Sequence, residues 1–173
     1  MMVNMNTNTY MTSFIIEGIN FTAVSSHRGL KKLFIGRYDK RDISDAIKLQ
    51  PDDPYMFGVY DQLKEYFERE RKKFEIPLDL TGTNFQLKVW NELIKIPYGI
   101  TISYKKLAER TGDLLAVRAV GKANGSNPIP VIVPCHRVIE ANGKLGGYSA
   151  GINIKDRLLK LEGSLSLELF EVA

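Results

Sequence analysis

Cysteine, histidine and long apolar runs are scarce in this sequence of 173 residues, which has one cysteine and two histidines. A single cysteine excludes an intrachain disulfide and a zinc site built from several thiolates. No apolar run approaches the roughly 18 residues of a membrane-spanning helix. Residues 1–12 are rich in Asn and Thr and lack the basic and apolar regions of a signal peptide. We therefore expect a cytoplasmic protein with no membrane partner and no metal site.

Charge is present but unevenly distributed. Residues 1–80 hold 12 basic and 12 acidic side chains, whereas residues 81–173 hold 12 and 8, so the net charge of +4 (12 − 8) lies in the second part. A basic excess suits a polyanionic partner such as nucleic acid, and one of this size also suits an ordinary soluble protein. With 44% hydrophobic residues, the chain can bury one core or two smaller ones.

The first 80 residues predict a small antiparallel sheet with a helix. Three runs rich in Phe, Ile, Val and Leu predict strands at Thr12–Ile16, Phe21–Ser26 and Lys31–Ile35. A polar segment follows, with a helical turn expected at Ser44–Leu49. From Pro54 to Lys73 apolar side chains recur every three or four residues, which predicts an amphipathic helix. Ile76–Leu80 indicates a further strand or an extended link.

The second part of the chain, from Gly82 onward, predicts a mainly helical unit. Thr83, Ser103 and Asn153 are placed to cap helices. The expected helices are Asn84–Ile94, Tyr104–Arg110, Leu115–Asn124 and Ile154–Glu162, the last closed by Gly163. Strands are expected at Val138–Ile139 and within the tail, Ser164–Ala173.

Two of these helices, Tyr104–Arg110 and Leu115–Asn124, are short and separated by a turn that contains Gly112. This spacing is typical of a helix-turn-helix motif, although any two packed helices give the same pattern. The second helix is rich in small residues, and only Arg118 and Lys122 give it charge. Small residues suit close approach to DNA and equally suit close packing against another helix.

The chemistry of the chain centres on Cys135, His136 and Arg137. The thiolate is the reactive form of cysteine, and neighbouring imidazole and guanidinium groups can lower the pKa of a thiol. Consecutive strand side chains point to opposite faces, so Cys135 and His136 can cooperate only at a turn or through a water. Pro134 favours such a turn, after an expected buried strand, Ile129–Val133. A structural, buried cysteine is the alternative on these residues alone.

The pentapeptide Pro-Cys-His-Arg-Val at residues 134–138 resembles the acceptor-cysteine signature of the O6-alkylguanine-DNA alkyltransferases, also called methylated-DNA–protein-cysteine methyltransferases. Other segments agree with that family in order and spacing across residues 81–163. They are Phe85–Trp90, Ile102–Tyr104, Arg118–Gly121, Asn127–Pro128, Gly146–Ser149 and Leu161–Gly163. Several independent motifs make this resemblance more specific than a single match would be.

The resemblance implies an α/β (α+β) fold class. Residues 1–80 would form an N-terminal α/β subdomain, ribonuclease H-like in the family, with a small antiparallel sheet and a helix. Residues 81–173 would form a C-terminal helix-turn-helix domain that carries the acceptor cysteine. Some relatives have a zinc site in the first part, but this sequence lacks the cysteines for one.

The resemblance also implies direct-reversal DNA repair. A suicide methyltransferase of this family moves the alkyl group of O6-alkylguanine, with O4-alkylthymine as a further candidate, irreversibly from duplex DNA to the cysteine after base flipping. The partner would be double-stranded DNA containing O6-alkylguanine, bound by a monomer. No cofactor is expected, since the sequence has neither a G-x-G-x-x-G nor a P-loop pattern and the family does not depend on S-adenosylmethionine.

The family's functional residues are matched by residues of this chain. Its catalytic residues correspond to Cys135, His136, Glu162, Tyr104 and Asn127. Its substrate-binding residues correspond to Pro130, Val138, Gly146, Tyr148 and Ser149. Its DNA-binding residues correspond to Arg118, Ala119, Gly121, Lys122 and Tyr104. Without the resemblance, Glu162 would be an ordinary helix-end carboxylate and Asn127 an ordinary turn residue.

In this scheme Glu162 pairs with His136, which activates the thiol through a water, and Arg118 is inserted into the base stack. Tyr104 faces the ring nitrogen that gains a proton as guanine leaves. The backbone carbonyls of Cys135 and Val138 face the exocyclic amine.

The resemblance implies roles in the pocket and in the cysteine segment as well, within the same scheme. Ser149 faces O6, while Pro130 and Tyr148 form walls of the pocket. Asn127 is a hinge that ties the recognition helix to the cysteine strand.

Two other functions stay open at this point. An alkyltransferase-like damage reader shares the helix-turn-helix and the pocket but lacks the acceptor cysteine, so the presence of Cys135 argues against it. A Cys-His-Glu hydrolase would turn over many times and would not need Arg118.

Overall fold

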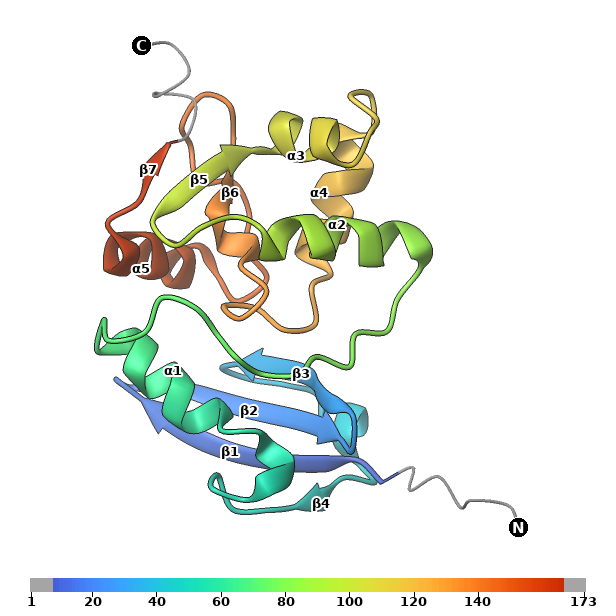
Figure 1. Cartoon of the computed structure of the whole chain (residues 1–173), viewed down its shortest axis with the longest axis vertical. Coiled ribbons are helices and arrows are strands. Elements are labelled where there is room, and N and C mark those ends of the chain that lie inside the picture. Colours follow the sequence, from blue (N-terminus) through green and yellow to red (C-terminus); the bar gives the residue numbers. More distant parts are fainter. Residues whose placement is uncertain (1–7, 167–173) are drawn as a thin grey trace. The chain divides into compact units, whose positions relative to one another are not determined.

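The computed structural model describes residues 8–166, and the chain divides into two compact units after Thr81 (Figure 1). The first unit holds a four-stranded, mostly antiparallel sheet and one α-helix, and the second holds four α-helices and a small parallel sheet. The α+β fold class expected from the sequence is therefore confirmed. No helix within the described residues is long and apolar enough to cross a bilayer.

The first unit is a sheet of order β3-β2-β1-β4 with α1 packed against it (Figure 1). Its elements are β1 (Tyr10–Ile16), β2 (Ile19–Ser26), β3 (Gly29–Ile35), β4 (Ile47–Lys48) and α1 (Val59–Phe67). β1, β2 and β3 pair antiparallel, and β4 pairs parallel to β1. The three predicted strands are thus confirmed, and each begins two residues earlier than expected. The aromatic ring of Phe67 lies 5.9 Å from that of Phe21, which joins α1 to β2 in the core.

Two expectations for this unit are wrong. The helix predicted for Pro54–Lys73 is interrupted, because Phe57 and Gly58 adopt left-handed backbone angles that separate the 3₁₀ turn η2 (Pro54–Met56) from α1. The turn predicted at Ser44–Leu49 is displaced. Asp39 caps an earlier 3₁₀ turn, η1 (Lys40–Ile43), and β4 then pairs with β1.

The segment that leaves the first unit is an extended link rather than a regular strand, one of the two forms expected. Leu30 of β3 donates its N–H to Pro77 and accepts from the N–H of Asp79, both at 2.8 Å. The buried Asp79 carboxylate accepts from Ser26 at 2.6 Å and pairs with Arg28 at 2.9 Å. These contacts fasten the link to the sheet.

The second unit surrounds a three-stranded parallel sheet of order β6-β5-β7 with helices. Its elements are α2 (Asn84–Ile94), β5 (Ile100–Ser103), α3 (Tyr104–Arg110), α4 (Val117–Gly125), the 3₁₀ turn η3 (Cys135–Arg137), β6 (Val138–Ile139), α5 (Ile152–Glu162) and β7 (Leu165–Ser166). α4 packs against both α2 and α3. The part of the predicted tail beyond Ser166 lies outside the described residues.

Side-chain caps define where the helices of this unit begin. Thr83 and Gln86 form a reciprocal capping box on α2, and the Ser103 hydroxyl accepts from the N–H of Lys106 on α3, so both predicted caps are confirmed. The predicted cap of α5 is wrong. Asn153 lies inside that helix, which begins after Gly151, whereas Gly163 closes it in the left-handed conformation as expected.

The strand predicted at Ile129–Val133 is also wrong, because this segment is a turn. The N–H of Val133 donates to the carbonyl of Ile129 at 2.9 Å, and Val131 has a φ of 73°. Pro128, Pro130 and Pro134 have no N–H to donate, so the segment cannot complete a strand ladder. α4 begins at Val117 rather than Leu115, since residues 113–116 form a turn in which Ala116 donates to Asp113.

Replacing Thr83 by Ala should destabilise the second unit by about 1 kcal/mol, because it removes the side-chain acceptor for the N–H of Gln86. Urea denaturation followed by circular dichroism measures this loss. Thr83→Ser keeps the hydroxyl and serves as the matched control. Equal midpoints for the two variants would contradict the role of the cap.

Candidate active site

The turn η3 separates three reactive side chains that are consecutive in the sequence. A 3₁₀ helix has about three residues per turn, so neighbouring side chains leave it in different directions. Cys135 lines a pocket, whereas His136 and Arg137 both contact the carboxylate of Glu162 on α5. The expected turn at the cysteine is therefore present, although no strand precedes it.

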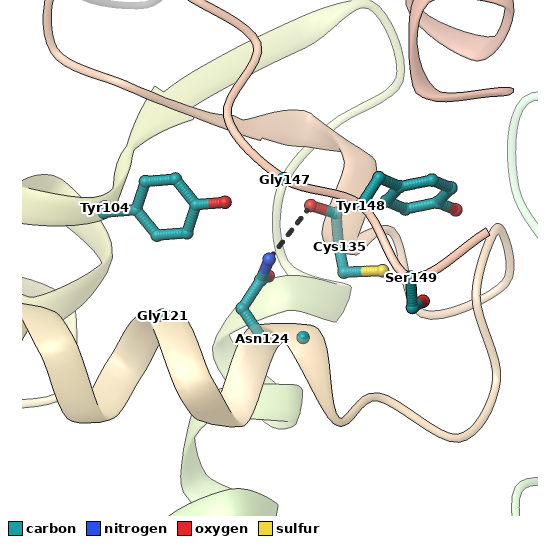
Figure 2. Close-up of a pocket in the computed structure, with 8 residues that line it drawn as sticks. Tyr104, Gly121, Asn124, Cys135, Gly147, Tyr148 and Ser149 are labelled. Carbon is teal, nitrogen blue, oxygen red and sulfur yellow. Dashed lines mark hydrogen bonds between the residues drawn. The ribbon is translucent and has the colours of Figure 1, made fainter. Parts of the chain in front are cut away.

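The pocket beside Cys135 has a volume of about 350 Å³. Its lining residues come from α3, α4, η3 and the loop after β6, and they are Tyr104, Gly121, Asn124, Gly125, Cys135, Gly147, Tyr148 and Ser149. Figure 2 shows Tyr104 on one side, Cys135, Tyr148 and Ser149 on the other, and Asn124 between them. Although Cys135 is only 2% exposed, its side chain borders a cavity rather than solid core. A pocket of this size suits a small ligand.

A buried charged cluster stands behind the pocket. One carboxylate oxygen of Glu162 lies 2.9 Å from Nε2 of His136, and Arg137 donates to both carboxylate oxygens at 2.9–3.3 Å. Burial alone would raise the pKa of Glu162, but His136 and Arg137 outweigh it and lower that pKa to about 2. Glu162 is therefore ionised at neutral pH.

His136 is held in its neutral form. Its side chain is fully buried, and burial lowers its pKa despite the opposing effect of Glu162. Because the ionised carboxylate can only accept, Nε2 carries the proton and Nδ1 keeps its lone pair. Nδ1 is buried and has no hydrogen-bond partner among the described residues. This nitrogen is therefore the basic atom of the ring.

The cation that acts on the thiol is Lys155 of α5, which was not among the predicted site residues. Burial raises the pKa of Cys135, whereas Asn127, the positive charge of Lys155 and Tyr148 oppose that effect. Arg137, the expected local activator, pairs instead with Glu162. The Lys155 side chain is fully buried, so its charge acts in a weakly screened environment.

Lys155 also holds the pocket together. Its ammonium donates to the carbonyl of Val138 at 2.6 Å and to that of Gly147 at 3.4 Å, and it lies 5.9 Å from the centre of the Tyr104 ring. Burial lowers the pKa of Lys155 to about 8, against the charges of Cys135 and Glu140. Spacing on α5 carried a signal for this residue, because Lys155 shares the buried face with Leu158, Leu159 and Glu162.

Asn127 fastens the turn that precedes the cysteine. Its amide nitrogen donates to the carbonyl of Val133 at 2.7 Å, and its amide oxygen accepts from the N–H of Ile129 at 3.0 Å. Asn124, one turn earlier on α4, donates to the carbonyl of Cys135 at 3.4 Å. Asn124 was not predicted as a site residue, since its alignment with the pocket depends on how α4 packs.

The remaining predicted residues fall into two groups. Arg118, Ala119 and Lys122 lie on the exposed face of α4, away from its buried residues. Pro130, Val138 and Gly146 do not line the pocket directly. Pro130 and Val138 are buried, and Gly146 lies so close to Tyr104 that an added Cβ would come within 3.3 Å of its ring.

Among residues 8–166, no group of three or more His, Cys, Asp or Glu side chains is placed to hold a metal ion. The arrangement instead offers a thiol, a neutral imidazole with a free lone pair, and an ionised carboxylate. These groups can activate a sulfur nucleophile.

Replacing Lys155 by Met should raise the pKa of the Cys135 thiol further, because a nearby cation favours the thiolate. Iodoacetamide alkylation of Cys135, measured against pH, should move to higher pH. The two profiles should approach each other well above pH 8, where wild-type Lys155 itself loses its charge. Lys155→Arg keeps the charge and should keep the profile. An equal shift in both variants would assign the effect to packing.

Comparison with known proteins matches both units of this chain to one family. A model of the 6-O-methylguanine DNA methyltransferase DNA-binding domain matches residues 84–164, and a model of the ribonuclease-like domain of the same proteins matches residues 19–80. The inducible methylated-DNA–protein-cysteine methyltransferase of Bacillus subtilis is 39% identical over 169 residues, covering 92% of this chain and 93% of the relative. The Mycobacterium bovis methyltransferase is 55% identical over 114 residues, covering 66% and 69%.

A solved structure agrees over almost the whole chain. The Mycobacterium tuberculosis protein OGT, crystallised in complex with DNA, superposes with a TM-score of 0.80 at 41% identity. The match covers 95% of this chain and 99% of that one. The resemblance seen in the sequence motifs is confirmed, and the chain belongs to the 6-O-methylguanine DNA methyltransferase family, the methylated-DNA–protein-cysteine methyltransferases.

Proposed function

We propose that this protein repairs duplex DNA by moving the alkyl group of O6-alkylguanine to Cys135. The observation that carries the proposal is the position of the Cys135 thiol at a pocket of about 350 Å³, with the His136–Glu162 pair behind it. A damage reader would need the pocket but not the thiol. Membership of a DNA methyltransferase family supports the same reaction.

The proposed reaction is a single displacement at the alkyl carbon. The thiolate sulfur forms a bond to that carbon while the bond from carbon to O6 breaks, and the electron pair of the broken bond passes to guanine. Tyr104, at the pocket wall, donates a proton to the departing base at a ring nitrogen. Protein and alkyl group end as a thioether, which has no good leaving group, so each molecule acts once.

The thiol proton leaves toward His136. Nδ1 is the basic atom of this ring, because Nε2–H faces the ionised Glu162. A water that bridges the sulfur and Nδ1 would carry the proton, as in a Cys-water-His-Glu relay. Arg137 keeps the carboxylate ionised when the ring becomes charged, and Lys155 favours the thiolate.

The substrate base must leave the double helix before it can react, since O6 lies within the base stack. The exposed face of α4 carries the small residue Ala119 and two positively charged residues, Arg118 and Lys122. We propose that this face meets the minor groove and that Arg118 occupies the space of the flipped base. The same helix lines the pocket through Gly121 and Asn124, so DNA binding and base capture share one element.

A monomer is sufficient for this scheme, because every proposed group comes from one chain. Ser149 and Tyr148 line the pocket, where Ser149 would donate to O6 and Tyr148 would form a wall. Val138 offers its carbonyl near the pocket, where it already accepts from Lys155.

Mixing the protein with a duplex oligonucleotide containing O6-methylguanine should add one methyl group to the peptide that carries Cys135. Mass spectrometry after proteolysis measures this gain, and it should stop at one equivalent per protein. Cys135→Ser should bind the duplex and gain nothing. An unmodified wild-type peptide would indicate a damage reader, and release of many product molecules per protein would indicate a hydrolase.

Replacing Arg118 by Ala should slow methyl transfer from duplex DNA by about tenfold or more. Extruding a base costs a few kcal/mol, and about 1.4 kcal/mol corresponds to a tenfold change in rate. Reaction with the free base O6-benzylguanine should change little, because no base must be flipped.

The matched control is Arg41→Ala, which removes the same charge from an exposed position in the first unit. It should leave both rates near wild type. If Arg118→Ala slows both substrates equally, its proposed role in base flipping is wrong.

A further inference from the structure

Asn124 is a buried polar residue of the pocket for which the proposed reaction has no use. It lies on the inner face of α4 and is 4% exposed. Figure 2 shows its amide between Tyr104 and Cys135, at the centre of the lining. A buried amide in a ligand pocket is a candidate for reading the ligand.

The two ends of this amide differ in their partners. Nδ2 donates to the carbonyl of Cys135 at 3.4 Å, and this contact sets the orientation of the amide. Oδ1 is buried and has no hydrogen-bond partner within residues 8–166. A buried acceptor without a partner loses its hydrogen bonds to water and gains none in return, so such atoms are rare in native proteins. An unpaired acceptor on a residue that lines a pocket therefore points to a donor on the ligand.

Tyr104 supplies the neighbouring group. Burial raises the pKa of its hydroxyl, and the Asn124 amide beside it opposes that effect. The hydroxyl therefore stays protonated at neutral pH and can donate. The pocket thus presents a donor from Tyr104 next to an acceptor from Asn124.

An O6-alkylated guanine has the complementary pair. Its ring atom N3 accepts a hydrogen bond, and its 2-amino group, on the adjoining carbon, donates one. Alkylation at O6 leaves N1 without a proton, so in DNA the 2-amino group is the only N–H donor on the lesion base. An unpaired acceptor in this pocket can be satisfied by no other group of that base.

We propose that Oδ1 of Asn124 accepts a hydrogen bond from the 2-amino group of the flipped base and makes the pocket selective for guanine lesions. This inference rests on the proposed repair function and adds a specificity-determining residue to it. Nδ2 of the same side chain donates to the Cys135 carbonyl, which would be a second acceptor for the two N–H bonds of the amine. Asn124 therefore organises the edge of the pocket that recognises the amine.

A substrate–residue cycle tests the proposal. Methyl transfer is measured for wild type and Asn124→Leu, each with a duplex containing O6-methylguanine or O6-methylhypoxanthine, which lacks only the 2-amino group. Wild type should prefer O6-methylguanine by about tenfold or more, since a site with unpaired polar groups rejects a ligand without the matching donor. In Asn124→Leu the preference should fall by about tenfold.

The ratio of the rates with O6-methylguanine and O6-methylhypoxanthine distinguishes recognition of the 2-amino group from a purely structural role of Asn124. If Asn124 has no part in recognising the amine, the variant slows both substrates equally and the ratio is unchanged, which would overturn the proposal. Asn124→Ala provides a second variant if leucine prevents folding, as judged by circular dichroism. Asn91→Leu, the same change at an exposed position of α2, should keep the wild-type ratio.

The same measurements distinguish failure of the proposed repair function from failure of the proposed role of Asn124. No methyl transfer from O6-methylguanine by folded wild-type protein would refute the proposed function itself. Transfer by wild type with the same substrate preference in every Asn124 variant would leave that function intact and refute the role of Asn124.

Discussion

The buried carboxylate of Glu162 is the interaction on which the second unit depends. It accepts from Arg137 and pairs with His136, and its second oxygen accepts from the N–H of Gly99 at 3.1 Å. Arg137 in turn donates to the carbonyl of Ile96 at 2.6 Å. Three segments distant in sequence, the end of α2, the turn η3 and the end of α5, therefore meet at one charge. Removing one partner of such a buried cluster costs about 3–5 kcal/mol, because the other charge stays buried and unpaired.

The prolines and Asn127 explain why irregular chain precedes the 3₁₀ turn at Cys135. Prolines at 128, 130 and 134 remove backbone donors, and the Asn127 side chain spans the turn by donating to the carbonyl of Val133 and accepting from the N–H of Ile129. The turn then directs Cys135 to the pocket while its two neighbours reach Glu162. His136 and Arg137 thus fix the turn to Glu162, and Cys135 faces the pocket, where a ligand can bind.

Local chemistry in the sequence predicted much of the fold. Caps at Thr83 and Ser103, and the glycine closure at Gly163, depend only on residues within one turn, so they could be identified without tertiary contacts. The apolar run Ile129–Val133 was misleading because its β-branched residues favour a strand, whereas the prolines around it prevent strand pairing. In this segment the hydrophobic pattern correctly indicates burial, whereas the missing backbone N–H donors determine that the chain forms a turn rather than a strand.

Some residues that the family motifs name lie together here, with Cys135, Tyr104, Tyr148 and Ser149 at the pocket and His136 at Glu162, whereas partners from elsewhere in the chain were missed. Arg137 stands next but one to Cys135, yet its charge is neutralised by Glu162, and the cation that favours the thiolate comes from Lys155. Asn124 likewise reaches the pocket only because α4 turns its polar amide inward with Val120 and Ala123. Proximity in sequence therefore gave Arg137 too large a role in lowering the pKa of the thiol, and it gave no indication of Lys155. Electrostatics at a buried thiol follow distance and burial, so the charges that control it emerge only when the helices are packed.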